Sequence, residues 1–499
     1  MHNRHVDSEG AIKAGDRVLV GTTLITVDDK TASEMKAGDI LLGIASSGRL
    51  RRIPAGVLAE VDRAVGDAAA AFPLMASVDQ QRVTKFYETA ARRLADDSVF
   101  RGVAAANTAD VDAARARGRS TTRLELTASM RTSMIEALQM WRDIDGSGSA
   151  GLSINHDGWT VSEHRAPLGV IGFVFEGRPN VFADATGVLR GGNTVVFRIG
   201  SDALGTARAL MSLVVQPALV EAGLPGGAVN LVDSAEHAAG WSMFSDTRLS
   251  LAVARGSGEA VAELGSIARQ AGIPVSLHGT GGAWMIVGES ADAVRLSEVV
   301  RHSLDRKVCN TLNVVCVPRT AAEVLVPVVL EAADTAASRR SGRARVHAVG
   351  DAIKFCGDGD EIDVARADGI HREPRVTAAD APLLAHEFEW EETPEFSVVL
   401  VDSVEEACNL FNTHSPQFVV SCVSEQMSDH EVVWTRCNAP FVGDGFTRWV
   451  DGQFALLRPE LGLSNWQSGR LFARSAILSG DSAFSVRLRV TQSDPGLHR

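Results

Sequence analysis

A regular alternation of apolar, strand-like runs with helical stretches between 170 and 277 constrains the fold more than any other feature of the sequence. The apolar runs are Val170–Phe175, Thr194–Phe197, Val229–Val232, Leu249–Val253 and Pro274–Leu277. Helices are expected between successive runs. Because crossovers between parallel strands are right-handed, the pattern predicts a doubly wound, Rossmann-type α/β domain. Its ligand is expected at the carboxyl ends of the strands.

A second alternating region, from about Trp284 to Asn438, predicts a second α/β unit. Its strand-like runs are Met285–Val287, Leu312–Val317, Ser397–Val401 and Phe418–Ser421. These runs are short, rich in Val and separated by helical stretches. The chain is therefore expected to fold as α/β throughout its central part.

The N-terminal part has a different pattern. Residues 1–75 hold short alternating runs such as Arg17–Val20, Thr23–Val27 and Asp39–Ile44, which predict a small β-rich extension that is separable from the rest. A capping-box pattern at Ser77–Gln80 predicts the start of a helix, and helical structure is expected to continue to about 144.

Two segments far apart in the chain are expected to form strands outside these two regions. Gly146–His164 is rich in Gly and Ser with alternating apolar residues, which predicts a β-hairpin. Phe484–Val490 alternates apolar and polar residues and is expected to be an edge strand that can pair with another subunit.

Charge and composition restrict the partners. The formal net charge is −13, which would repel nucleic-acid phosphates and anionic membrane surfaces, so neither is expected as a partner. The first residues have no apolar signal core, and no apolar run approaches the roughly 20 residues that span a bilayer. A cytoplasmic protein is expected.

The six cysteines all lie in the second half of the sequence, without a C-x-x-C pair, and are expected to be reduced thiols that bind no metal. Cys316 and Cys422 lie in apolar runs, as buried core residues do. Cys309 instead follows Arg306 and Lys307, and nearby positive charge favours a reactive thiolate. A buried structural thiol remains the alternative.

Two further motifs follow strands of the first alternating region. The turn Arg255–Gly258 lies between a strand and a helix, where backbone N–H groups can approach a phosphate. The alternative is a plain structural turn. Asn180, in the segment Glu176–Asn180, can offer its amide to a developing oxyanion, and a helix cap is the alternative.

Many motifs in the same order make the chain resemble the gamma-glutamyl phosphate reductase (glutamate-5-semialdehyde dehydrogenase) family of the aldehyde dehydrogenase superfamily. The resemblance covers about residues 80–495. It is carried by Arg82-Val83, Asn107–Arg115, Pro167–Gly172, Glu176–Asn180, Gly192–Arg198, Gly223–Val229, Cys309–Thr311 and Phe446–Gly452.

The resemblance implies a cysteine mechanism with a nicotinamide cofactor, NADPH with NAD as the alternative. Cys309 would attack an acyl phosphate, Asn180 would hold the oxyanion, and the resulting thioester would be reduced to an aldehyde. The cofactor would be bound by Arg198, Gly200, Ser201, Arg255, Gly256, Ser257 and Gly258. Substrate contacts are expected from Arg178, Asn310, Arg448 and His278.

The resemblance also implies an aldehyde dehydrogenase-like domain organisation, in which a late segment returns to the cofactor domain. The expected parts are a β-rich extension (1–75), a cofactor-binding domain (76–275 with 440–480), a catalytic domain (276–439) and oligomerisation strands (146–166 and 483–499). A homo-oligomer, dimer or tetramer, is therefore expected.

One departure from hydrolytic aldehyde dehydrogenases supports acyl-phosphate chemistry. Those enzymes have a general-base Glu in a Leu-Glu-Leu-Gly-Gly context, whereas this chain has Ser276 at the Glu position of Pro274–Gly279. Without that base, attack of water on a thioester should be slow. His278 is the exception, because a histidine can activate water. A hydrolytic, NAD(P)-dependent aldehyde dehydrogenase is thus the second hypothesis.

Three segments differ from the family near the expected substrate site. They are Ser415–Val420, Gly443–Arg448 and Ser464–Arg474, where family polar residues are displaced or missing. Polar matching carries large specificity, so a close analogue of glutamyl 5-phosphate from a specialised pathway is an alternative substrate. A carboxylate kinase would supply the acyl phosphate. A non-catalytic scaffold is a third hypothesis, which the joint presence of Cys309 and Asn180 disfavours.

Overall fold

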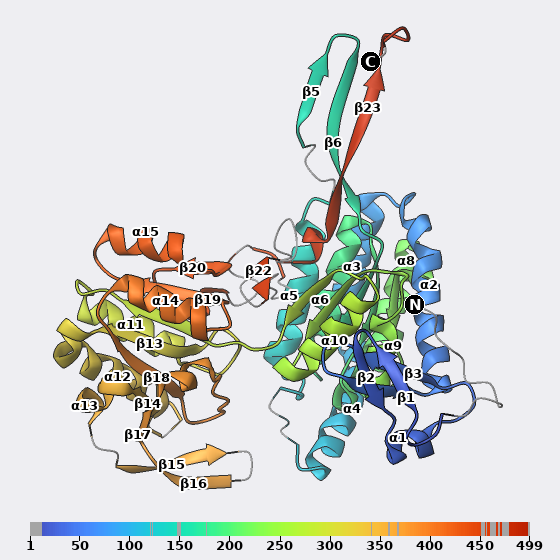
Figure 1. Ribbon diagram of the computed structural model, residues 1–499. Helices are drawn as coiled ribbons and strands as arrows, with labels where there is room; N and C mark the ends of the chain where they lie inside the picture. The colour runs from blue at the N-terminus through green and yellow to red at the C-terminus, as the bar shows by residue number, and fades with distance from the viewer. Residues whose placement is uncertain are drawn as a thin grey trace. The chain divides into compact units, whose positions relative to one another are not determined.

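The computed structural model describes residues 12–119, 121, 123–146, 151–175, 177–340, 342–357, 360–366, 369–450, 455, 457–459, 466–467, 470–471 and 479–497. The chain forms two compact units, each with its own parallel sheet and core (Figure 1). Unit 1 comprises Met1–Gly279, Leu456–Leu463 and Ile477–Arg499. Unit 2 comprises Thr280–Ala455 and Ser464–Ala476.

The sheet of unit 1 confirms the predicted doubly wound arrangement. Its five parallel strands have the order β11-β10-β7-β8-β9. They are β7 (Val170–Val174), β8 (Thr194–Arg198), β9 (Val229–Leu231), β10 (Leu249–Arg255) and β11 (Val275–His278). The chain passes from β7 to β9 on one side and then crosses to β10 and β11 on the other. The point where the strand order reverses therefore lies between β7 and β10.

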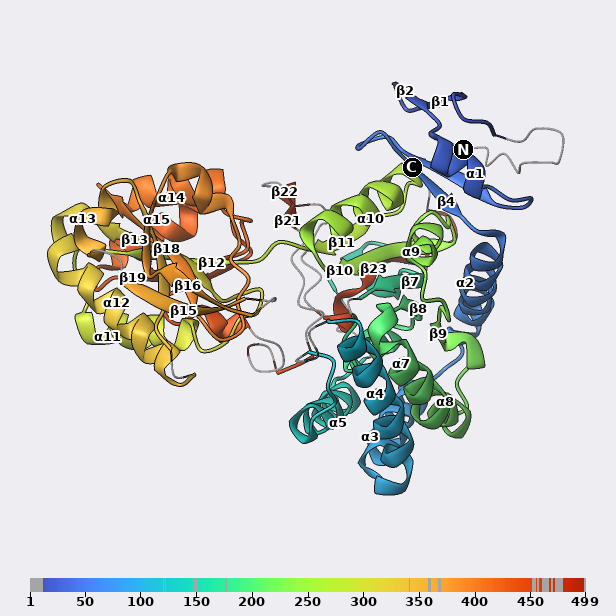
Figure 2. The same ribbon diagram turned by 90° about the horizontal axis from the view of Figure 1, so that it is seen from below.

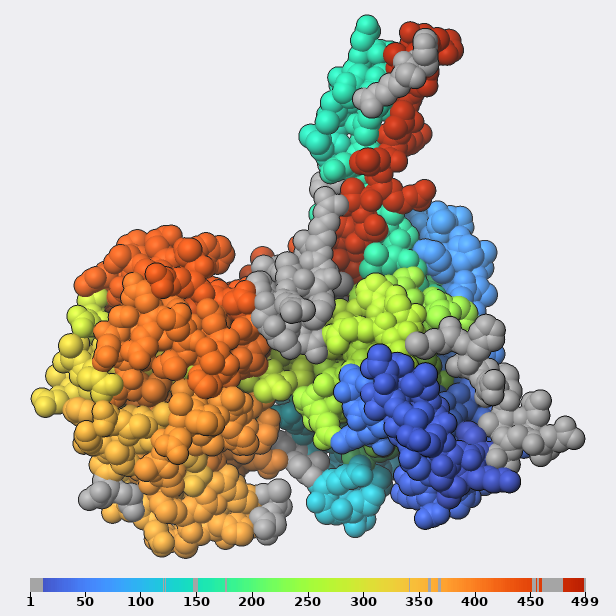
Figure 3. Space-filling view, viewed as in Figure 1, coloured from blue at the N-terminus to red at the C-terminus, as the bar shows by residue number. Residues whose placement is uncertain are grey.

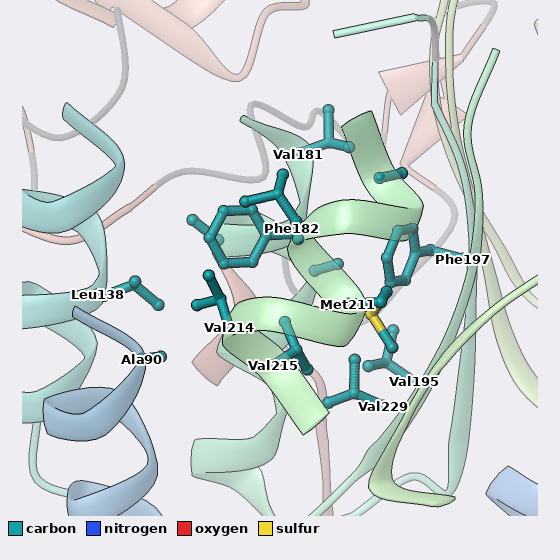
Figure 4. Close-up of a cluster of buried hydrophobic side chains, with 14 of the residues drawn as sticks. Ala90, Leu138, Val181, Phe182, Val195, Phe197, Met211, Val214, Val215 and Val229 are labelled. Carbon is teal, nitrogen blue, oxygen red and sulfur yellow. The ribbon is translucent and has the colours of Figure 1, made fainter. Parts of the chain in front are cut away.

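Helices cover both faces of this sheet. They are α2 (Ala55–Met75), α3 (Gln80–Ala95), α4 (Asp97–Ala116), α5 (Ala128–Asp143), α6 (Val181–Thr186), α7 (Leu204–Leu210), α8 (Gln216–Ala222), α9 (His237–Phe244) and α10 (Gly258–Gln270). Alternate strand residues face opposite layers: Val195 and Phe197 pack with α3, α7 and α8, whereas Val196 packs with α2, α9 and α10. Figure 4 shows Phe182, Phe197 and Met211 in the first of these cores.

The N-terminal extension is β-rich only as far as Ile53. Two antiparallel hairpins are present, as expected: β1 (Arg17–Val20) with β2 (Thr23–Thr26), and β3 (Ile40–Ile44) with β4 (Arg49–Ile53), with the short helix α1 (Asp29–Glu34) between them. The β prediction is wrong for 55–75, which form the 21-residue helix α2. Buried residues at helical spacing, including Val57, Val61 and Ala64, attach α2 to the core of unit 1.

The predicted helix after this extension begins with a different cap. The capping residue of α3 is Asp79, whose side chain accepts a hydrogen bond from the backbone N–H of Arg82 at 2.9 Å. Ser77, the predicted cap, instead donates from its hydroxyl to the carbonyl of Leu74 at 2.9 Å. Ser77 thus ends α2 rather than starting α3.

A three-stranded antiparallel sheet joins the two segments that the sequence predicts as strands outside the α/β regions. Its order is β23-β6-β5, with β5 (Ser153–His156), β6 (Trp159–Pro167) and β23 (Phe484–Gln492). Strand β23 pairs along the whole of β6, from Phe484 opposite Pro167 to Gln492 opposite Trp159. Figure 3 shows this sheet extending from the remainder of unit 1.

One helical stretch of unit 1, Ser201–Ala222, is long and apolar enough by composition to cross a membrane. This differs from the expectation that no apolar run of the chain approaches the length of a membrane span. More than half of it is buried, and Leu210, Val214 and Leu219 lie in the core that surrounds Phe197. Its apolar composition is therefore accounted for by packing inside unit 1.

Unit 2 contains the second predicted α/β region. Its seven parallel strands have the order β17-β14-β18-β13-β12-β19-β20. They are β12 (Ala283–Val287), β13 (Leu312–Pro318), β14 (Arg345–Val349), β17 (Val376–Ala379), β18 (Glu395–Val401), β19 (Val419–Val423) and β20 (Phe441–Gly443). Its helices are α11 (Ala293–Ser303), α12 (Ala322–Ser338), α13 (Ile353–Cys356), α14 (Val404–His414) and α15 (Met427–Arg436) (Figure 2).

Two small antiparallel pairs complete unit 2. They are β15 (Glu361–Arg366) with β16 (Gly369–Pro374), and β21 (Trp466–Gln467) with β22 (Arg470–Leu471). Strands β14, β17 and β20 were not predicted from the sequence. Most of the altered segment Ser464–Arg474 lies outside the described residues.

Candidate active site

Cys309 is the accessible cysteine of the protein. All six cysteines lie in the described residues, and Cys309 is half-buried whereas the other five are buried. It lies in the loop between α11 and β13, where its carbonyl accepts a hydrogen bond from the N–H of Gly282 at 2.8 Å. This bond holds the cysteine beside the residue that precedes β12. The thiol is thus positioned at the amino ends of two adjacent strands, β12 and β13.

Two threonines fix the loop around Cys309. The hydroxyl of Thr311 accepts from the N–H of Val308 at 2.8 Å and donates to the carbonyl of Arg306 at 2.7 Å. The hydroxyl of Thr447 donates to the carbonyl of Asn310 at 2.7 Å. The loop is therefore held both internally and from a segment far along the chain.

Arg448 and Asn310, both expected to contact substrate, belong to this loop framework. The guanidinium of Arg448 is 7% exposed and donates to Asp305 at 2.5 Å and to the carbonyl of Arg306 at 3.4 Å. Asn310 is buried, and its side-chain oxygen has no hydrogen-bond partner among the described residues. In this structure Arg448 thus positions the cysteine loop, and its charge is already balanced by Asp305.

Lys307, one of the two cations that suggest a reactive Cys309, is less available to the thiolate than the sequence indicates. Lys307 forms an ion pair with Glu387 at 2.5 Å, and its side chain is almost completely buried. Glu387 also accepts a hydrogen bond from the N–H of Gly281. A cation that is already paired with a carboxylate stabilises a neighbouring thiolate less, because the two fields partly cancel. Lys307 therefore stabilises a thiolate at Cys309 less than its position in the sequence predicts.

An apolar cluster lies against Cys309. It consists of Ala283, Phe418, Val419 and Val450, with Phe441, Trp449 and Cys309 packed against it. Phe418 is 4% exposed and contacts Phe441 edge to face at 5.4 Å between ring centroids. Phe418 stands in a segment where the family has polar residues, so the wall beside the thiol is apolar in this chain.

Asp444, in the second altered segment, lies near the carboxyl ends of the strands of unit 2, whereas Cys309 lies at the amino ends. Its carbonyl and carboxylate accept hydrogen bonds from Arg295, at 2.8 and 3.2 Å. Arg295 is in the first turn of α11, which follows the carboxyl end of β12. Cys309 precedes β13, at the amino ends. Asp444 is thus bound to Arg295, and a role of this position in substrate recognition stays a prediction.

In unit 1, Asn180 lies in the turn between β7 and α6. It occupies the capping position of α6, but its side chain makes no capping hydrogen bond. The alternative role of helix cap is therefore not used, and the half-buried amide is left for another partner. This placement is at the carboxyl end of β7, next to the point where the strand order reverses.

Arg198 ends β8 and is nine-tenths buried. Its guanidinium donates to the carbonyls of Ala235 and Glu236, at 3.3 and 3.4 Å, while Nε has no hydrogen-bond partner among the described residues. Burial lowers its pKa. Gly200 and Ser201 follow it, and Ser201 begins a short 3-10 helix. These residues can hold an anionic or hydroxyl-bearing ligand at this edge.

The turn Arg255–Gly258 connects β10 to α10, as expected. Ser257 occupies the capping position of α10, but its side chain accepts no hydrogen bond from the first backbone N–H groups of the helix. The N–H of Gly256 donates to the carbonyl of His278 at 3.3 Å. A side chain at Gly279 would lie 2.9 Å from the Cα of Gly258, so the two backbones approach closely here. Such a turn fits a phosphate.

A charged cluster at the same edge brings together Arg255, Asp184, Arg178 and His278. Arg255 forms an ion pair with Asp184 at 3.5 Å. Burial raises the pKa of Asp184 to about 6, although the two arginines oppose this shift. Burial, together with the charges of Arg255 and Arg178, lowers the pKa of His278 to about 3.

Neither residue that could replace the missing general base is suited to that role. A histidine with a pKa near 3 is a weak base at neutral pH. Ser276 is buried in the middle of β11. No group of three His, Cys, Asp or Glu side chains in the described part of the chain could hold a metal ion.

The chain has two parallel α/β units. One contains a glycine-containing strand-to-helix turn, and the other contains an accessible cysteine ahead of a central strand. This combination is that of an aldehyde dehydrogenase. The aldehyde dehydrogenase family model matches residues 45–350. A gamma-glutamyl phosphate reductase of Rhodopseudomonas palustris (strain TIE-1) is 33% identical over 316 residues, which are 61% of this chain and 71% of the relative. A gamma-glutamyl phosphate reductase of Syntrophomonas wolfei is 28% identical over 377 residues, 72% of this chain and 82% of the relative.

The fold shows the same likeness. The crystal structure of gamma-glutamyl phosphate reductase from Thermotoga maritima superposes with a TM-score of 0.74 at 22% identity, covering 88% of this chain and all of that one. The chain therefore belongs to the aldehyde dehydrogenase family and, within it, to the gamma-glutamyl phosphate reductases. As a member of that family it is an oxidoreductase. The family match begins at residue 45 and so includes helix α2, whereas the resemblance in the sequence is expected only from about residue 80.

Proposed function

We propose that the protein reduces an acyl phosphate, glutamyl 5-phosphate or a close analogue, to the semialdehyde and phosphate, with NADPH as donor and NADH as the alternative. The observation that carries the proposal is Cys309, the one accessible thiol among six cysteines, in a loop held by Thr311, Thr447 and Arg448. Membership of the gamma-glutamyl phosphate reductases supports the substrate class.

In the proposed reaction the thiolate of Cys309 attacks the acyl carbon, the C–O bond to phosphate breaks, and a thioester forms. The amide of Asn180 donates a hydrogen bond to the carbonyl oxygen as negative charge develops on it. When bound, the reduced cofactor supplies a hydride to the thioester carbon. The C–S bond then breaks, which releases the aldehyde and regenerates the thiolate of Cys309. Thr447 and Arg448 act through the loop, by keeping the sulfur in position.

The proposed cofactor site follows from the residues at the carboxyl edge of the unit 1 sheet. Arg198, with Gly200 and Ser201, would bind the adenosine ribose or its 2′-phosphate. A nine-tenths buried guanidinium whose Nε lacks a partner among the described residues supports an anionic ligand there. Gly256, Ser257 and Gly258 would take a phosphate at the start of α10, whose capping residue provides no side-chain acceptor.

The substrate proposal extends to the part of the molecule that recognises the amino-acid end. Phe418 is buried beside Cys309, in the segment where polar recognition is expected for glutamate. Arg448 donates from one nitrogen to Asp305 and to the carbonyl of Arg306. An uncompensated charged substrate end is costly to desolvate. We therefore favour an N-blocked or less polar analogue over glutamate 5-semialdehyde.

Oxidation of semialdehydes in the reverse direction tests these proposals together. Glutamate 5-semialdehyde and a panel of analogue aldehydes would be assayed with NADP⁺ and NAD⁺, with and without inorganic phosphate. The proposal expects turnover that requires phosphate. Phosphate-independent production of the acid would instead support the hydrolytic hypothesis, and kcat/KM for glutamate semialdehyde far above every analogue would show that the altered pocket still recognises glutamate. Failure to bind either nucleotide would favour the scaffold hypothesis.

The proposed chemistry also implies partners. An acyl phosphate is labile in water, so a carboxylate kinase would supply it in the cytoplasm, where NADPH is available. The three-stranded sheet β23-β6-β5 has two open edges, which would pair with another copy of the chain in a homo-oligomer, dimer or tetramer.

A further inference from the structure

The β3–β4 hairpin of the N-terminal extension lies along the outer side of helix α10. Arg51, in β4, donates from Nε and Nη2 to the two carboxylate oxygens of Glu263, at 3.1 and 2.8 Å. Arg49 contacts Glu259 at 2.9 Å and Glu263 at 3.7 Å. Glu263 is nearly buried, with its side chain 11% exposed, and this favours a defined bidentate geometry. Two arginines of one hairpin thus face two carboxylates of the first two turns of α10.

The other end of α10 is attached to the same hairpin. The side-chain amide of Gln270 donates to the carbonyl of Gly43 at 2.7 Å, and its oxygen accepts from the N–H of Ala45 at 3.1 Å. The amide therefore pairs with the hairpin backbone as a neighbouring strand would. Because contacts occur at both ends, the hairpin restrains the helix along its length rather than at one point.

The neighbouring helix takes part in the same contact. The guanidinium of Arg51 lies over the ring of Trp241 in α9, 5.0 Å from its centroid. Beneath these polar contacts, Ile44 and Ile53 of the hairpin share one apolar core with Leu264 of α10. Figure 2 shows the blue hairpin strands next to α9 and α10. The β3–β4 hairpin thus covers the outer side of helices α9 and α10 of unit 1.

The first residues of α10 are part of the proposed cofactor site. Gly256 and Ser257 form its entry turn, and Glu259 follows Gly258 directly. A shift of α10 along or away from the sheet would move the backbone N–H groups of this turn. The ligand binds only the fraction of molecules in which the turn is correctly placed, so its apparent dissociation constant rises as that fraction falls.

We propose that the β3–β4 hairpin is a brace for α10, in which Arg51 and Glu263 are positioning residues that keep the nucleotide-binding turn Gly256–Gly258 in its binding-competent position. This inference rests on the nucleotide role proposed for that turn. It assigns a function to part of the N-terminal extension, for which the sequence suggested only a separable appendage. All residues of the brace belong to unit 1.

The test uses the full-length protein with Arg51→Ala and Glu263→Gln. Calorimetric titration with NADPH should show a dissociation constant raised about threefold or more in both variants. Arg51→Lys, which keeps the positive charge beside Glu263, should recover part of the affinity that is lost in Arg51→Ala. Arg92→Ala is the control, because Arg92 also forms an ion pair between two elements of unit 1: its Nη2 donates to both carboxylate oxygens of Glu221, at 2.8 and 2.9 Å, between α3 and α8.

A second measurement does not depend on the cofactor. In the cofactor-free protein, hydrogen exchange of the amides in the first turns of α10 should be faster in Arg51→Ala than in the wild type, and unchanged in Arg92→Ala. If the wild type binds NADPH while Arg51→Ala binds it equally well and exchanges equally slowly, the brace is refuted and the proposed function stands. If the wild type binds no dinucleotide at all, the nucleotide role of the turn fails and this inference fails with it.

Discussion

The thiol of Cys309 is the single group on which the proposed chemistry depends. Cys309→Ser should abolish both reduction and oxidation, because a hydroxyl at this position cannot replace the thiolate in the covalent step. Binding of NADPH should be nearly unchanged, since the cofactor residues lie in unit 1. Activity assays beside calorimetry check both expectations. Cys356→Ala, at a buried cysteine of α13, is the control and should retain activity; substantial turnover of Cys309→Ser would remove Cys309 from the mechanism.

Asn180 has an amide that no helix-capping bond uses. Asn180→Ala should lower kcat by about a hundredfold or more, because an oxyanion donor acts mainly in the transition state. The affinity for NADPH should change much less. Steady-state kinetics, with Asn155→Ala on the exposed strand β5 as control, separates the two effects. An unchanged kcat would mean that Asn180 is not the oxyanion donor.

His278 predicts a dependence of stability on pH. Its pKa falls from 6.5 to about 3 on folding, so the unfolded chain takes up a proton at higher pH than the native protein does. The contribution of the neutral imidazole is complete above pH 6.5 and is lost as the pH falls towards 3, at up to about 1.4 kcal/mol per pH unit. His278→Gln should therefore flatten the acid limb of the unfolding free energy, measured by denaturant titration at several pH values. An unchanged limb would contradict the lowered pKa.

The candidate site residues are easier to predict from the sequence than the tertiary contacts around them. Cys309, Asn180 and the turn Gly256–Gly258 are local motifs, and local motifs are visible in a sequence. The partner of Lys307 is Glu387, 80 residues away, and nothing in either segment indicates the pairing. Phe418 was noticed as a departure from the family, but its burial against Cys309 depends on the packing of β19.

At the scale of elements, strand-helix alternation predicted both parallel sheets, because buried parallel strands are continuous apolar runs. Helix α2 was missed. Its buried face consists largely of Val and Ala, including Ala64, Ala68 and Ala71, and small residues in a run of alanines give little contrast between the two faces. The hairpins that precede it have Gly and Asp at their turns, and this pattern favours β structure for the whole segment.

Because helix α2 packs in the core of unit 1, we expect the N-terminal segment to be integral to that unit rather than separable. Val61 is completely buried between α2 and the sheet, in the same core as Val170 and Val196. Val61→Ala should therefore lower the free energy of unfolding by about 2 kcal/mol, the loss of two buried methyl groups and the cavity they leave. Val220→Ala, on the exposed side of α8, is the matched control and should have almost no effect. Equal stability of the two variants, by denaturant unfolding, would restore the view that the extension is separable.

At the scale of the whole molecule, the proposed site residues lie at the carboxyl ends of the strands in unit 1 and at the amino ends in unit 2. In unit 1, Asn180, Arg198 and the turn after β10 all follow strands, as the rule for doubly wound sheets predicts. In unit 2, Cys309 and Phe418 precede β13 and β19 and so lie at the amino ends. A pattern of apolar runs does not indicate at which end of the strands the site residues lie.

The proposed homo-oligomer depends on the edges of the sheet β23-β6-β5. Strand β23 is an edge strand whose Leu488 and Val490 are 67% and 59% exposed. Two apolar side chains on an open edge favour burial against a second copy of the chain. The double variant Leu488→Lys with Val490→Lys should therefore dissociate the assembly, because charges on an edge strand oppose pairing.

Light scattering at several protein concentrations measures the mass, and NADPH binding confirms that unit 1 remains folded. Val324→Lys, at an exposed position of α12 in unit 2, is the control and should leave the mass unchanged. A wild type that is monomeric at all concentrations, or a double variant with unaltered mass, would show that this sheet does not mediate association.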